Sequence, residues 1–152
     1  MSHRNRILAA LCVAALPAAW MAAPVQARDE GAATLRVEVA SFRNAKGTLN
    51  CRLFTDAASF PDGEGVRTLR ARIDGTQAAC VFEGLAPGAY AVAVVHDENG
   101  NVRLDRNFVG IPSEGYGVSN NRTYAMASPK WDESRFTLAA REALVLRIGL
   151  RY

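Results

Sequence analysis

Four oxygen-bearing side chains recur at alternate positions in the middle of the chain and could together bind a cation. Asp97, Asn99 and Asn101 fit positions 1, 3 and 5 of a calcium-binding loop. The main-chain carbonyl of Arg103 falls at position 7, and Asp105 falls at position 9. Calcium prefers oxygen ligands that converge from alternate residues, so the pattern predicts a calcium site at these four side chains.

The same run departs from a full calcium loop at two positions. Position 6 is Val102 where glycine is usual, and position 12 is Phe108 where a bidentate glutamate is usual. Only two of the four side chains bring charge, unless Glu98 or Glu114 folds in. Any calcium site should therefore be weak. The alternative is that these Asp and Asn side chains stabilise turns by bonding to their own backbone.

A lone histidine precedes this run. His96 is the only histidine after residue 27, and pairing with Ser119 or Tyr116 would give it the elements of a hydrolase. One histidine is too few for most transition-metal sites, and the sequence has no nucleophile elbow or metalloprotease motif. Because His96 is also in phase with the apolar residues of the preceding strand, we interpret it as a hydrogen-bonded plug at the sheet edge.

Aromatic and amide side chains gather further along the chain and could bind carbohydrate, since aromatic faces and amide donors suit sugars. The predicted ligand-binding residues are Tyr116, Asn120, Asn121 and Trp131. Asn107 and Phe108 could extend this platform. The alternative is that all of these side chains pack or hydrogen-bond within their own loops.

The first 27 residues resemble a secretory signal that is cleaved after Ala27. Arg4 and Arg6 precede an uncharged apolar run at 7–23, and small residues follow at the −3 and −1 positions. That run is shorter than the roughly 20 residues that span a bilayer, so we expect no transmembrane segment in the mature chain. Of the 18 basic residues, two leave with this leader, and the remaining 16 nearly balance 15 acidic residues. Such a balance argues against nucleic-acid binding.

Two cysteines remain after the leader, which removes Cys12. An even number of cysteines in an exported protein predicts a disulfide, here between Cys51 and Cys80. Each lies in an alternating pattern with apolar neighbours two residues away, so both side chains should point into one core. The alternative is a redox pair, which the lack of a Cys-x-x-Cys motif disfavours.

The elements that must position these side chains are β-strands, because apolar residues alternate with polar ones along most of the chain. Turn signals separate the runs, among them 44–47 and Asp74-Gly75, the latter predicting a hairpin. The pattern predicts an all-β, antiparallel Greek-key β-sandwich of about seven strands. The expected strands cover 34–39, 49–53, 69–73, 78–82, 90–95, 136–138 and 144–150.

A predicted sharp turn and a long loop lie outside the regular strand pattern. Leu85, Pro87-Gly88 and Tyr90 predict a sharp turn closed by a tyrosine corner. Residues 96–123 form a long connection of 28 residues, and such connections are usually functional or disordered. Its apolar residues and glycines favour an ordered loop, which we take as the candidate functional surface.

The run from Tyr90 to Asn101, with the motifs that follow it, resembles the DUF2141 family of exported bacterial proteins of unknown function. The later motifs are Leu104-Asp105, Asn107-Phe108, Gly110-Ile111-Pro112, Glu114-Gly115-Tyr116-Gly117 and Ser119-Asn120-Asn121. The resemblance covers roughly residues 35–152. It implies a small β-sandwich similar to prealbumin-like and carboxypeptidase-regulatory-like modules, and it implies no established activity or catalytic residue.

The sequence therefore predicts a cleaved leader at 1–27, a short tail at 28–33 and a single β-sandwich domain at 34–152. We expect a non-enzymatic binding or accessory module of the cell envelope, periplasmic or extracellular, with an envelope protein or a glycan as partner. No cofactor is required, although calcium is possible. The alternatives are a calcium-supported carbohydrate-binding module and a hydrolase centred on His96.

Overall fold

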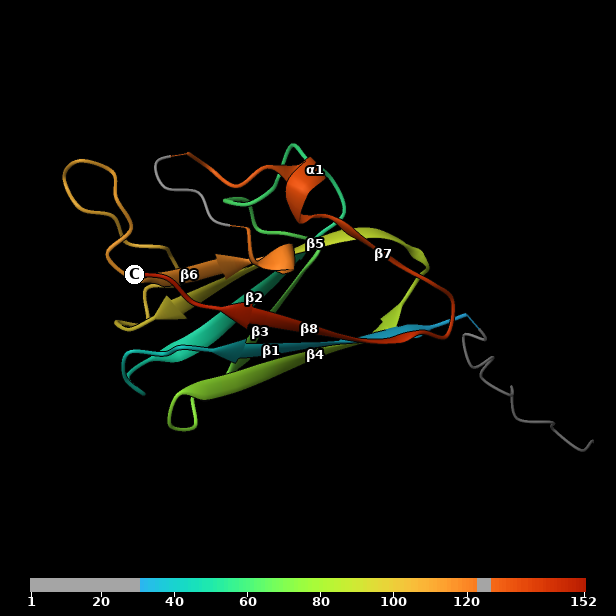
Figure 1. Ribbon diagram of the computed structural model, residues 1–152, viewed down its shortest axis with the longest axis horizontal. Helices are drawn as coiled ribbons and strands as arrows, with labels where there is room; N and C mark the ends of the chain where they lie inside the picture. The colour runs from blue at the N-terminus through green and yellow to red at the C-terminus, as the bar shows by residue number, and fades with distance from the viewer. Residues whose placement is uncertain (1–30, 123–126) are drawn as a thin grey trace, which may run out of the picture.

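In the computed structural model, which describes residues 31–122 and 127–152, eight strands form two stacked sheets (Figure 1). A three-stranded sheet has the order β4-β1-β8. A second sheet has the order β3-β2-β5-β6, with β7 paired to β5. The strands are β1 (Ala33–Ala40), β2 (Thr48–Phe54), β3 (Arg67–Ala71), β4 (Gln77–Leu85), β5 (Gly88–Asp97), β6 (Gly115–Val118), β7 (Phe136–Leu138) and β8 (Ala143–Gly149). The predicted leader and the first residues of the predicted tail lie outside the described residues.

The predicted all-β sandwich is confirmed, with one pairing that differs from an antiparallel arrangement. Strand β8 runs parallel to β1, so that Leu146 lies opposite Val37. The preceding strand, β7, pairs with the beginning of β5, where Leu138 lies opposite Gly88. The chain therefore re-enters the three-stranded sheet at the end where β1 begins, and the two strands must run in the same direction.

The Asp74-Gly75 turn forms, but it does not join two paired strands. Asp74 and Gln77 exchange backbone hydrogen bonds of 2.8 and 3.0 Å. Beyond them, β3 pairs with β2 in one sheet and β4 pairs with β1 in the other. The expected hairpin is instead a crossing between layers. Alternation of side chains tells which face of a strand is apolar, and it does not tell which strand lies beside it.

The predicted tyrosine corner is confirmed where the chain returns to the five-stranded sheet. The hydroxyl of Tyr90 donates a hydrogen bond of 2.8 Å to the carbonyl of Ala86. Leu85 is buried just before this turn and closes that end of the core. This bond fixes the start of β5, the central strand of the sheet that carries the candidate site.

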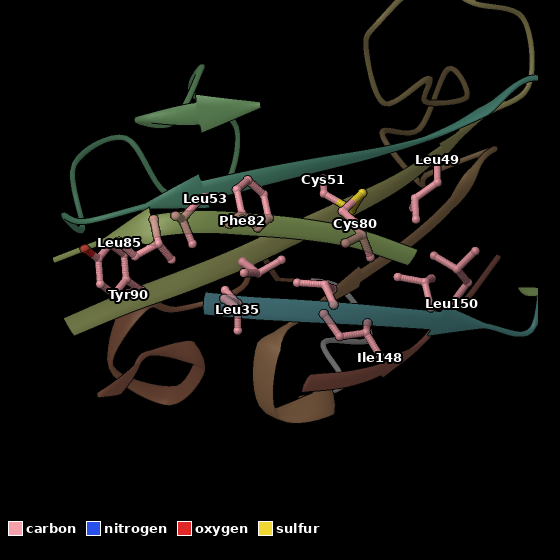
Figure 2. Close-up of a cluster of buried hydrophobic side chains, with 14 of the residues drawn as sticks. Leu35, Leu49, Cys51, Leu53, Cys80, Phe82, Leu85, Tyr90, Ile148 and Leu150 are labelled. Carbon is pink, nitrogen blue, oxygen red and sulfur yellow. A yellow bond between two sulfur atoms is a disulfide. The ribbon is translucent and has the colours of Figure 1, made fainter. Parts of the chain in front are cut away.

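The main core lies between the sheets and contains the disulfide (Figure 2). Cys51 comes from β2 and Cys80 from β4, so the bond joins the two layers. Both cysteines are buried, as predicted. Around them pack the large buried side chains of both sheets, including Leu35, Leu49, Leu53, Phe82, Val92, Leu138 and Ile148.

A second, smaller apolar cluster covers part of the outer face of the five-stranded sheet. It contains the buried residues Phe54, Phe60, Ala91, Ala93 and Val118, with Trp131 packed against them. Phe60 belongs to the 55–66 excursion, and Trp131 begins the short helix α1 (Trp131–Ser134). These two segments cover one end of the face, and the 98–114 loop rises at the other end. The space between them is where the candidate site lies.

Candidate functional site

The outer face of the five-stranded sheet is hollowed into a groove between the second cluster and the 98–114 loop. Its floor follows the strand register, in which Ala93 of β5 lies opposite Arg52 of β2 and Val118 of β6. Because side chains alternate across a strand, these three point to the same outer face. The small Ala93 side chain leaves room above it. The cavity measures about 620 Å³, within the range typical of small-molecule sites.

The walls of this groove combine apolar side chains with polar groups. Two residues further along β5 from Ala93, Val95 lies opposite Tyr116 of β6, and both side chains line the cavity. The 98–114 loop adds apolar side chains on one side, and the 127–129 segment and Pro61 add to the rim. The apolar wall residues of the loop are Leu104, Val109, Ile111 and Pro112.

Three arginines also line the groove, with one carboxylate. The Arg52 guanidinium donates to the carbonyls of Val102 (2.7 Å), Gly63 (3.3 Å) and Asp62 (3.4 Å), which ties the loop and the 55–66 excursion to the sheet. It forms no ion pair within 4.0 Å among the described residues. Arg106 lies 3.8 Å from the largely exposed Asp62 carboxylate, a separation at which an exposed pair contributes little. The groove therefore carries net positive charge.

A single buried carboxylate organises the start of the 98–114 loop. Asp97 Oδ1 accepts hydrogen bonds from the backbone N–H of Gly100 (2.7 Å) and Asn101 (3.1 Å). Its Oδ2 accepts from the backbone N–H of Val102 (2.9 Å) and from the Asn50 side chain (3.0 Å). Val102 has a φ of 68°, a left-handed conformation that β-branched residues rarely adopt. The bonds to Asp97 hold the backbone in this conformation.

Three of the four predicted calcium ligands meet in a second network. Asp105 accepts from the side-chain amides of Asn99 (2.6 Å) and Asn101 (2.8 Å). The two asparagine oxygens accept from backbone N–H groups of Asn101 and Arg103. The fourth, Asp97, contacts this network through the Asn101 backbone. Within residues 31–122 and 127–152, there is no group of three or more His, Cys, Asp or Glu side chains that could hold a metal ion.

The base of the loop is held by a second buried carboxylate. Glu114 accepts from the backbone N–H of Glu98 through Oε1 (2.9 Å) and from that of Asp105 through Oε2 (3.1 Å). Glu114 is 4% exposed, so both bonds are shielded from water. Both Glu114 oxygens accept from backbone N–H groups of the loop, and a role for Glu114 as a calcium ligand stays a prediction.

The calcium hypothesis stays a prediction and has a direct thermal test. A site with a Kd near 10⁻⁴ M would stabilise the protein by about 2.7 kcal/mol at 10 mM calcium, because only the folded chain binds. The expected result is a melting temperature several degrees higher in calcium than in EDTA. Asp105→Asn should abolish the rise, since it removes one of the two charged ligands. Equal melting temperatures in EDTA and calcium would contradict the calcium hypothesis.

The predicted plug at the sheet edge is His96, which is fully buried. Its Nε2 donates to the carbonyl of Lys46 (2.7 Å), and its Nδ1 lies 2.7 Å from the hydroxyl of Tyr152. That hydroxyl also accepts from the backbone N–H of Arg43 (3.0 Å). Burial raises the pKa of Tyr152, which keeps the phenol protonated. Both ring nitrogens are thus bonded within the fold.

The hydrolase alternative would need a hydroxyl nucleophile beside His96. The Ser119 hydroxyl is buried and bonded to the carbonyl of Ser134 (2.5 Å) and to the backbone N–H of Val92 (3.0 Å). Tyr116 lines the groove on the outer face, whereas His96 belongs to the inner face of β5 with Val92 and Val94. The bonds observed for His96 are therefore those of a structural residue.

Replacing His96 with phenylalanine should destabilise the protein by about 2 kcal/mol, because the buried Lys46 carbonyl loses its histidine partner and the Tyr152 hydroxyl keeps only its bond from the Arg43 N–H. Urea unfolding measures this loss. Tyr152→Phe is the matched control: it keeps the bond between His96 and the Lys46 carbonyl, removes the Nδ1 contact and the exposed bond from the Arg43 N–H, and should cost about 1 kcal/mol. An unchanged unfolding midpoint in His96→Phe would contradict the structural role.

A carboxylate beside this histidine makes stability depend on pH. Burial alone would raise the pKa of Glu98, but hydrogen bonds from Asn44 and Arg43 and the Arg43 charge hold that pKa below its ordinary value. A carboxyl with a lowered folded-state pKa contributes stability that is present above its unfolded pKa and lost as the pH falls through the folded value. The Glu98 contribution should therefore be present at pH 7 and lost on acidification.

Glu98→Gln tests this pH dependence, because glutamine keeps the shape and removes the charge. At pH 7 the variant should unfold at lower urea concentration than the wild type. At an acidic pH below the lowered folded-state pKa of Glu98, the two proteins should unfold together. A gap of the same size at both pH values would show that charge at this position does not contribute.

The residues predicted to bind carbohydrate have different surroundings in the structure. Tyr116 lines the groove, and Trp131 packs edge-on against Phe60 at 6.1 Å between ring centroids. The Asn120 amide donates to carbonyls at the end of α1, and the Asn121 side chain bonds to two backbone groups of β8. The amides thus tie the short 3₁₀ turn at 119–121 to its neighbours. Carbohydrate binding stays a prediction.

The tip of the 98–114 loop carries exposed apolar side chains on a hydrogen-bonded turn. The Asn107 side-chain oxygen accepts from the backbone N–H of Val109 (3.1 Å) and Ile111 (3.0 Å). Phe108, which directly follows Asn107 in this turn, is 99% exposed. These local bonds order the tip, while Arg52 and Glu114 hold the loop to the rest of the fold.

Sequence reasoning missed the floor of the groove, above all Arg52 and Ala93. A signal was present, because Ala91, Ala93 and Val95 make the outward face of β5 as apolar as its inward face. An outward strand face without polar residues must be covered or must bind something. The partner strands that bring Arg52 and Val118 beside it are set by long-range register.

Comparisons with known proteins add one finding. The sequence model of a family described as "Uncharacterized protein conserved in bacteria (DUF2141)" matches residues 37–145. Searches of curated proteins and of solved structures each found no match. No helix in residues 31–122 and 127–152 is long and apolar enough to cross a membrane.

Proposed function

Because the chain belongs to the DUF2141 family, whose description names no activity, we propose its function from the groove: a non-enzymatic binding module of the cell envelope that holds a small apolar ligand. The observation that carries this proposal is the cavity of about 620 Å³ on the outer face of β2, β5 and β6. Apolar walls with a few charged groups at defined positions are typical of small-molecule sites.

Export to an oxidising compartment is part of the same proposal. The Cys51–Cys80 disulfide supports it, because such bonds persist outside the reducing cytosol. A non-enzymatic role is supported by the bonds of His96, whose ring nitrogens are both engaged by Lys46 and Tyr152. The groove itself offers three arginines, a tyrosine and the largely exposed Asp62, with no histidine or cysteine among its lining residues, and this set supports a binding role.

A neutral apolar dye tests whether the groove binds. Nile red should bind the purified mature protein with one-to-one stoichiometry and a rise in emission. Ile111→Ser should weaken binding about fivefold, because it removes an apolar wall residue that is already half exposed and contributes little to stability. Val109→Ser should have a similar effect.

Val145→Ser is the matched control. Val145 is an exposed valine on β8 of the other sheet, outside the groove. Its replacement should leave dye binding unchanged. An equal loss of binding in Val145→Ser and Ile111→Ser, or no rise in emission with the wild type, would refute the proposed groove.

A further inference from the structure

We propose that the ligand of this groove is a single-chain amphiphile with a phosphate headgroup, the phosphate contacting Arg52, Arg103 and Arg106. This inference rests on the proposed function, because it assigns a chemical class to the ligand of the same site.

The charge in the groove is incompletely balanced. Arg52 is half-buried and bonded only to main-chain carbonyls, which are neutral. Arg103 is exposed, and no hydrogen bond or ion pair engages its guanidinium among the described residues. Arg106 has a long contact with Asp62, the one carboxylate lining the groove. Three positive groups and one negative group leave a net charge of about +2 at neutral pH.

The groove is also apolar over much of its surface. Val95 contributes to the floor, and Leu104 and Ile111 to the wall. Phe108 and Val109 extend this surface onto the exposed tip of the loop. A ligand that carried only charge would leave these side chains in water, and a ligand that was only apolar would leave three guanidinium groups uncompensated. An anionic amphiphile satisfies both surfaces.

The charge arithmetic favours phosphate over carboxylate. A phosphate monoester carries about −1.5 to −2 at pH 7 and offers three acceptor oxygens. A carboxylate carries one charge and offers two oxygens. Planar guanidinium groups bond well to either, but only the phosphate neutralises the groove and has an oxygen for each arginine. We therefore expect phosphate to bind more tightly than carboxylate on the same tail.

Four dodecyl compounds with one tail and different headgroups test the inference by calorimetry, each below its micelle-forming concentration. Dodecyl phosphate should bind the mature protein most tightly, about tenfold more tightly than dodecanoate. Dodecyl maltoside, which is neutral, should bind more weakly again. Dodecyltrimethylammonium should not bind, because its charge repels the arginines. Added sodium chloride should weaken binding of the phosphate compound.

Arg103→Gln is the informative variant, because this side chain makes no contact that holds the fold. It should weaken dodecyl phosphate binding about fivefold and leave dodecyl maltoside binding unchanged. Arg72→Gln is the matched control, since Arg72 is an exposed arginine outside the groove. It should change neither affinity. Arg52→Gln should also weaken binding, and its unfolding curve will show whether the loop remains attached.

The outcomes separate this inference from the proposed function. Equal affinity for dodecyl phosphate and dodecyl maltoside would overturn the headgroup assignment and leave an apolar groove in place. Tighter binding of dodecanoate than of dodecyl phosphate would overturn the choice of phosphate. Lack of binding by all four compounds, together with lack of Nile red binding, would overturn the proposed function as well.

Discussion

Replacing Cys51 and Cys80 together with alanine should lower the free energy of unfolding by about 3.5 kcal/mol. The two residues are 29 positions apart, and their bond closes a loop of the unfolded chain that would otherwise sample many more conformations. The bond also joins β2 to β4, which lie in opposite sheets (Figure 2). Urea unfolding of the double variant measures the loss.

The matched control for this variant is the wild type after complete reduction under denaturing conditions. Its refolded form should lose a similar amount of stability, because the same constraint is absent. A double variant that unfolds at the same urea concentration as the oxidised protein would contradict the bond. So would free reaction of both thiols with a labelling reagent in the untreated native protein.

Asp97→Ala should cost about 3 kcal/mol and release the first part of the 98–114 loop. The Asp97 carboxylate is 1% exposed and accepts four hydrogen bonds, three of them from consecutive backbone N–H groups. Alanine would leave these donors and the Asn50 amide without their partner. The loop carries the apolar wall of the groove, so Nile red binding should weaken together with stability.

Two measurements distinguish this loop effect from a general loss of stability. Hydrogen exchange should accelerate at residues 100–102 far more than in β1, whose bonds do not depend on Asp97. Asp132→Ala is the control, because the Asp132 side chain is 86% exposed in α1 and should change stability by less than about 0.5 kcal/mol. Unchanged exchange at residues 100–102 in Asp97→Ala would contradict the organising role.

Much of the fold follows from local sequence. Alternation of apolar residues predicted the strands, and the same alternation placed Cys51 and Cys80 in one core. The tyrosine corner at Tyr90 was predictable because its bond to Ala86 spans only four residues. Strand β6 was not predicted, since its four residues include two glycines and carry no alternating pattern.

The groove could not be predicted in the same way, because it is a product of long-range pairing. Arg52 and Ala93 are 41 positions apart and lie opposite each other only because β2 and β5 pair in one register. The crossing at Asp74-Gly75 shows the same limit of local sequence. The residue types predicted the turn, but they did not predict that β3 and β4 belong to different sheets. The Asp97 and Asn99 turn was visible as oxygens at alternate positions, and that pattern does not distinguish a cation site from a self-bonded loop.

The central claim is that the outer face of β2, β5 and β6 is the binding surface of this protein. An NMR titration of ¹⁵N-labelled mature protein with dodecyl phosphate tests it most directly. The account predicts the largest shifts at Arg52, Ala93, Val95 and Tyr116, with smaller shifts in the wall of the 98–114 loop. Shifts concentrated on β1, β4 and β8, or spread evenly over the protein, would contradict it.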